Sequence, residues 1–154
     1  MTTLNAVYCK FGEVSEAAQL LETELGNILL EIEGVEAGLF SNERPQEAAE
    51  ILKRINSSTL GRLLKDLDKK TGKLNHGGDA LAKALTERNR LAHSFFRLHN
   101  FRRNSKEGCA LMMADLEEIH RSLLAAYKLV LAVSGIDLDA LAPMAMPRKH
   151  RKLS

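Results

Sequence analysis

Apolar residues recur at alternating spacings of four and three over two long stretches of this chain. The first stretch runs from Val14 to Ile32, and the second runs from Cys109 to Val133. This spacing places the apolar side chains on one face of an α-helix and leaves the charged side chains on the other faces. With only 5% aromatic residues and three prolines among 154 residues, the composition also favours helix. We therefore expect an all-α fold.

Shorter helices are predicted between these two stretches. Pro45 suits the first turn of a helix over residues 46–55. Ser58 and Thr59 can cap the next helix, and Gly72 can end it. Each is long enough to cover part of an apolar core.

The remaining chain predicts one more long helix and a tail. The run Asn75-His76-Gly77-Gly78 precedes a helix from residue 79 to about residue 98, and the chain turns again near residues 102–105. Short connections between amphipathic helices favour a compact antiparallel bundle of four to five helices over residues 1–140. Residues 141–154 lack periodicity, so we expect a disordered basic tail, with a solubilising role or nonspecific binding to nucleic acid as alternatives.

The charge is distributed unevenly along the chain. The formal net charge is +2, but it is −4 for residues 1–82, +6 for residues 83–106, −4 for residues 107–147 and +4 for residues 148–154. The basic stretch inside the folded part is therefore residues 83–106. A basic stretch of this kind attracts anions such as nucleic acid.

The cysteines and the lengths of the apolar runs indicate the cellular compartment. Cys9 and Cys109 do not form a disulfide framework, and the heptad position of Cys109 favours a core role over a nucleophile. No secretory signal precedes the first helix, and no apolar run reaches the roughly 18 residues that span a bilayer. We expect a cytoplasmic protein without a membrane partner.

Arg88 interrupts the apolar stripe of the helix over residues 79–98. On a helical wheel it lies at the centre of the stripe, between residues such as Leu81 and Phe95. A guanidinium stays charged, and burying it without a partner costs several kcal/mol. Arg88 therefore needs an anionic ligand or an internal carboxylate, for which Glu22 and Glu24 of the first helix are the alternatives.

Asn89 and His93 lie beside Arg88, four residues apart and on neighbouring turns of one side of the helix. A permanent cation, an amide and a titratable imidazole are the groups that phosphodiester cleavage without a metal needs. The alternative for His93 is a surface histidine without a function. The five histidines show no metal-ligand spacing, so we expect no metal site.

The segment from Arg88 to His93 resembles the signature of HEPN domains (higher eukaryotes and prokaryotes nucleotide-binding). That signature is an arginine, a polar residue, three to five other residues and a histidine, in small helical bundles of toxin–antitoxin, CRISPR and anti-phage systems. The resemblance covers most of residues 8–134. It also rests on Phe11-Gly12, Thr59-Leu60-Gly61-Arg62-Leu63 and Leu91-Ala92-His93-Ser94-Phe95-Phe96.

The resemblance implies a metal-independent endoribonuclease without a cofactor. The RNA 2′-hydroxyl would attack the phosphate, leaving a 2′,3′-cyclic phosphate and a 5′-hydroxyl. His93 would act as general acid or base, Arg88 would stabilise the phosphorane, and Asn89 would orient one of them or the phosphate. Two protomers would form a homodimer with a composite site.

The resemblance also implies a biological role, with one departure. Such a protein would be a toxin with a cognate antitoxin protein, or an anti-phage effector. In HEPN toxins that are paired with a nucleotidyltransferase, a tyrosine two residues after the histidine accepts nucleotides. Phe95 occupies that position here, so neutralisation by that route is not expected.

The basic and aromatic side chains around the motif suggest RNA contacts. Phe95, Phe96 and Phe101 could stack on bases, although aromatic residues at helical spacing are usually core. The class that competes with a ribonuclease is a noncatalytic helical module that binds a partner protein or a nucleotide through the same face. Candidate phosphate contacts, with a solvated helix face as the alternative, are Arg90, Arg97, Arg102 and Arg103.

Overall fold

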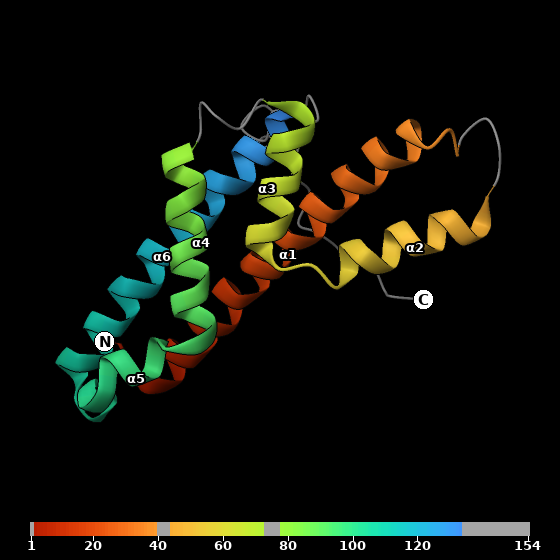
Figure 1. Cartoon of the computed structure of the whole chain (residues 1–154). Helices are drawn as coiled ribbons and strands as arrows, with labels where there is room; N and C mark the ends of the chain where they lie inside the picture. Colours follow the sequence, from red (N-terminus) through yellow and green to blue (C-terminus); the bar gives the residue numbers. More distant parts are fainter. Residues whose placement is uncertain (1, 40–43, 73–77, 134–154) are drawn as a thin grey trace, which may run out of the picture.

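A computed structural model describes residues 2–39, 44–72 and 78–133. Within these ranges six α-helices and one 3-10 helix pack together, and there is no strand (Figure 1). The all-α prediction is confirmed, with six helices in place of four to five. The predicted tail and most of the predicted glycine break lie outside the described residues. The elements are α1 (Leu4–Glu36), α2 (Pro45–Asn56), α3 (Leu60–Thr71), α4 (Gly78–His93), α5 (Phe95–His99), η2 (Asn100–Asn104) and α6 (Lys106–Val133).

The helix ends follow local capping chemistry. The Thr3 hydroxyl accepts a hydrogen bond from the Ala6 amide at 3.1 Å, so α1 begins ten residues before the first predicted apolar position. Thr59 caps α3 in the same way, and Gly72 ends α3 in the left-handed conformation with φ of 63°. Pro45 lies in the first turn of α2, as predicted.

The long helix predicted over residues 79–98 is broken. Ser94 leaves the helical conformation with φ of −145° and ψ of 0°, and α5 begins at the next residue. The break turns Phe95 and His99 into the protein, where both are buried. Because no glycine or proline marks this position, the sequence pattern did not reveal it.

The core lies where α1, α4 and α6 meet, and α3 covers the middle of α1 (Figure 1). Where burial is described, the apolar periodicity predicted the parts of this core on α1 and α6 correctly, except that Ile32 is only partly buried. On α4 the prediction was less accurate, because Ala92 is exposed and Leu85 is only partly buried. None of the helices in the described ranges is both long and apolar enough to cross a membrane. Buried positions shared by prediction and structure include Val14, Leu21, Leu25 and Ile28 on α1, and Cys109, Met112, Leu116, Ile119, Leu123 and Val130 on α6.

The two longest helices run in the same direction, which corrects the simple antiparallel bundle. Lys10 and His120 are in contact near the start of α1, and Leu20 and Tyr127 line one pocket further along both helices. Helix α4 runs antiparallel to both. The contacts of α4 and α5 with these two helices run in the opposite order along the chain, because Arg88 contacts Glu22 and Phe96 contacts Phe11, while Lys83 contacts Glu118 and Arg90 contacts Asp115.

Candidate functional site

Arg88 forms an ion pair with the first helix. Its Nε donates to Glu22 Oε1 at 2.8 Å, and its Nη1 donates to Asn89 Oδ1 at 3.2 Å. The side chains of Arg88 and Glu22 are 24% and 29% exposed, so the pair is only partly removed from water. Of the two carboxylates that the sequence suggested as partners of Arg88, Glu22 is therefore the one that pairs with it, and the Arg88 side chain stays partly open to solvent.

Arg88 lies at the edge of the apolar stripe rather than at its centre. Ala84 and Leu91 on one side are buried, whereas Ala92 on the other side is exposed and Leu85 is only partly buried. The buried face of α4 is therefore rotated away from Arg88. This rotation lets the guanidinium reach both Glu22 on α1 and solvent, without full burial of a charge.

Asn89 and His93 are both exposed on α4, four residues apart. The His93 imidazole has no side-chain hydrogen bond to any of the residues that the structure describes. Arg88 and His93 are separated by a rise of about 7.5 Å and by about 140° around the helix. The two side chains do not touch, so only a bound ligand or a second molecule can connect them.

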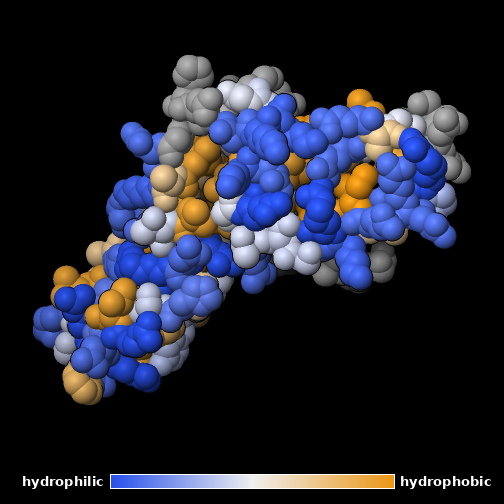
Figure 2. All heavy atoms as spheres, viewed as in Figure 1, coloured by the Kyte–Doolittle hydropathy of each residue, from blue (hydrophilic) through white to orange (hydrophobic). Residues whose placement is uncertain are grey.

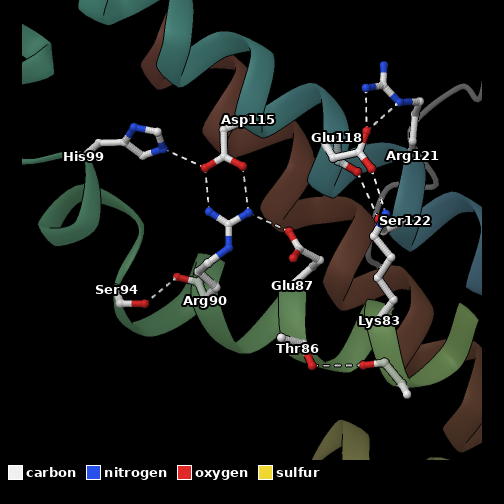
Figure 3. A network of polar contacts seen from close by, with 11 residues as sticks. Lys83, Thr86, Glu87, Arg90, Ser94, His99, Asp115, Glu118, Arg121 and Ser122 are labelled. Atoms are coloured by element: carbon white, nitrogen blue, oxygen red, sulfur yellow. Dashed lines mark hydrogen bonds and ion pairs between the residues drawn. The ribbon is translucent and has the colours of Figure 1, made fainter. Parts of the chain in front are cut away.

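Arg90, two residues further along, is turned toward the protein interior (Figure 3). Its Nη1 and Nη2 donate to the two Asp115 oxygens at 2.5 and 2.7 Å, and Nη2 also donates to Glu87 at 2.6 Å. Hydrogen bonding to Asp115 raises the pKa of the Arg90 guanidinium above its ordinary value. Arg90 is one of the four arginines predicted to contact RNA, but in the structure it pairs with carboxylates of the same chain.

His99 extends this network and was not singled out from the sequence. Its Nε2 lies 2.6 Å from Asp115 Oδ2, and its Nδ1 lies 3.0 Å from Arg102 Nη1. Burial raises the pKa of Asp115, but hydrogen bonds from Arg90 and His99 lower it more, so the pKa is below its ordinary value. The network joins α4, α5, η2 and α6 at the end of the motif helix. No sequence signal pairs His99 with Asp115, because the break at Ser94 determines where His99 points.

The other predicted RNA contacts are exposed. Arg97 is on α5, and Arg102 and Arg103 are on η2. Arg103 Nη2 donates to the Tyr8 hydroxyl at 2.9 Å, so it bridges η2 and α1. Arg102 contacts an imidazole and Arg103 contacts a hydroxyl, so neither of these contacts is with a carboxylate.

Within the described ranges, no group of three or more His, Cys, Asp or Glu side chains is placed to hold a metal ion. Glu22 also lines a pocket of about 310 Å³ that α1 forms with α2 and α3.

Comparisons with family models, with curated proteins and with solved structures find no match for this chain.

Proposed function

We propose that this chain is a metal-independent endoribonuclease of the HEPN type. The observation that supports the proposal best is the exposed polar strip on α4, where Asn89 and His93 lie beside a guanidinium that is hydrogen-bonded to Asn89. In this proposal His93 takes a proton from the RNA 2′-hydroxyl or gives one to the leaving oxygen, and Arg88 stabilises the charge on the phosphorane. Glu22 and Asn89 hold the guanidinium in position.

The proposed enzyme is a homodimer with a composite site. One chain supplies a single His93, and this imidazole is about 140° around the helix from Arg88. Cleavage needs a base for the 2′-hydroxyl and an acid for the leaving group, which His93 of each protomer can supply. The cytoplasm, a toxin or anti-phage role and a cognate antitoxin protein belong to the same proposal.

A noncatalytic binding module is the second candidate, and the ion pair between Arg88 and Glu22 favours it. A carboxylate at 2.8 Å partly neutralises the cation that would bind the phosphorane, and the His93 imidazole has no side-chain hydrogen bond to the residues that the structure describes. The pocket beside Glu22 gives such a module a place for a small ligand. In that case Arg88 has a structural role only.

Cleavage of mixed RNA in EDTA separates the two candidates. We expect wild-type protein to cleave RNA and His93→Ala to be inactive, with products that end in a 2′,3′-cyclic phosphate. The matched control is His120→Ala, which removes a histidine from α6 beside Lys10 and should cleave like wild type. Equal cleavage by wild type and His93→Ala, or intact RNA with wild type, would rule out the ribonuclease.

A further inference from the structure

One end of the molecule carries arginines that lack carboxylate partners. Nine arginines lie in the described ranges, and six of them form ion pairs with Asp or Glu, among them Arg88 and Arg90. The three that do not are Arg97, Arg102 and Arg103, all on α5 and η2. Residues 95–106 also contain Lys106 and no acidic residue. This end therefore carries an uncompensated positive charge.

The exposed aromatic rings are at the same end. Tyr8, Phe96 and Phe101 are 43%, 37% and 75% exposed, and they are the most exposed tyrosine and phenylalanine side chains in the described ranges. In Figure 2 hydrophobic and hydrophilic atoms are interleaved at the lower left, where Figure 1 places α5 and the start of α1. Cationic groups interleaved with exposed rings are typical of surfaces that bind single-stranded nucleic acid.

Part of this surface is held in place by contacts with α1 and α6. Phe96 packs against Phe11 and Tyr8, with ring centroids at 4.9 and 5.9 Å. The 3-10 helix η2 lies directly on α6, because a Cβ at Gly108 would come within 1.9 Å of the Arg102 carbonyl oxygen. A preformed surface loses less conformational entropy when it binds a ligand.

This surface continues from the motif helix. Arg88 contacts Glu22 while Phe96 contacts Phe11, so α4 and α5 descend antiparallel along α1. His93 lies between these two contacts and three residues before Phe96. An RNA strand that stacks on Phe96 would therefore lie at the end of α4 that carries His93.

We propose that α5, η2 and the first two turns of α1 form a binding surface for single-stranded RNA. Phe96 and Phe101 stack on bases, and Arg97, Arg102 and Arg103 bind the phosphates. The choice of RNA as the polyanion rests on the proposed function. A protein partner of this surface would need acidic side chains to match the arginines, whereas RNA supplies both the negative charge and the flat rings.

Binding of an RNA that cannot be cleaved tests this surface separately from catalysis. The probe is a fluorescent 2′-O-methyl oligonucleotide of about ten nucleotides, whose blocked 2′-oxygen prevents cleavage but not stacking. We expect Phe96→Leu, which keeps an apolar side chain but removes the ring, to weaken binding about 5-fold to 100-fold. We expect Arg102→Gln with Arg103→Gln to weaken binding and to reduce its salt dependence.

Matched controls are available on α6. Leu124→Ala changes an apolar side chain that is 40% exposed, and Arg121→Gln removes an arginine that is 66% exposed and paired with Glu118. Both should bind the probe like wild type. If Phe96→Leu unfolds, as judged by circular dichroism, Phe101→Ser replaces it, because the Phe101 ring is mostly in solvent.

The outcomes separate this surface from the catalytic proposal. Probe binding that depends on Phe96 supports the surface even if the protein cleaves no RNA. Absent binding, or equal binding by wild type and the ring variants, would overturn it. So would a shift from dimer to monomer in Phe96→Leu with binding lost in parallel, since that result would make the surface an interface between two copies of the chain.

Discussion

Two arginines on one turn of α4 are equally exposed but differ in the partners of their guanidinium groups. The side chains of Arg88 and Arg90 are each 24% exposed, and each has a carboxylate partner. Arg90 donates to both oxygens of Asp115 and to Glu87, whereas Arg88 gives one Nε hydrogen bond to Glu22 and one Nη1 hydrogen bond to an amide. Arg90 therefore donates three hydrogen bonds to carboxylates, whereas Arg88 donates one.

The difference separates a structural guanidinium from one that can bind a ligand. The bidentate pair with Asp115 links α4 to α6 and, through His99, to α5, so it stabilises the connection between the motif and the last helix. The Nη2 of Arg88 has no hydrogen-bond partner among the described residues, and the Arg88 side chain is 24% exposed. An anion can therefore bind Arg88 without breaking an existing ion pair.

The largest expected effect is on catalysis at Arg88. Arg88→Ala should reduce RNA cleavage about 100-fold to 1000-fold, because in the proposed mechanism it removes the cation that stabilises the transition state. Its melting temperature should change little, since the pair with Glu22 is partly exposed. Initial cleavage rates and thermal melts of the same preparation measure both. A large drop in melting temperature with unchanged cleavage would reverse the roles that we assign to the two arginines.

The next effect is on stability at Arg90. Arg90→Ala leaves Asp115 and Glu87 without their cation, and we expect it to lower the free energy of unfolding by about 2 kcal/mol. This value is smaller than that for a fully buried pair, because the three side chains are partly exposed to solvent. For a chain of this size the melting temperature would fall by roughly 4–8 °C. Arg121→Ala is the control, since its pair with Glu118 is exposed and should contribute little. Equal melting temperatures in the two variants would show that the Asp115 network does not stabilise the fold.

The sequence predicted the helices and the core better than it predicted the partners of the arginines. Apolar spacing located Leu21 and Leu116 in the core because burial follows the helix period directly. The outward or inward direction of Arg90 depends instead on Asp115, which is 25 residues away and meets α4 only after the break at Ser94. Partners that are brought together by a tertiary contact leave no periodic signal in one sequence.

A smaller effect is expected when the carboxylate beside Arg88 is neutralised. Glu22→Gln keeps an acceptor for Nε but removes the negative charge, so the guanidinium should attract RNA more strongly. We expect an increase in probe affinity of a few-fold and a change in stability below about 1 kcal/mol. Binding titrations at two salt concentrations measure the first, and denaturant unfolding measures the second. Glu24→Gln is the matched control, because Glu24 is on the same helix but does not pair with Arg88. Weaker binding by Glu22→Gln would show that Glu22 supports the site through its charge.

The smallest effect is the pH dependence of the Arg90 network. The pKa of Asp115 is lowered in the folded protein, so its ionised form stabilises the fold above the ordinary carboxyl range, and this contribution is lost as the pH falls through the lowered value. We therefore expect the stability difference between wild type and Asp115→Asn to be constant near neutral pH and to shrink below about pH 4. Denaturant unfolding of both proteins at a series of acidic pH values measures this difference. A gap that stays constant through the acid range would mean that Asp115 titrates alike in the folded and unfolded chains. Arg90 would then be no better paired than Arg88, and the contrast between the two arginines would rest on geometry alone.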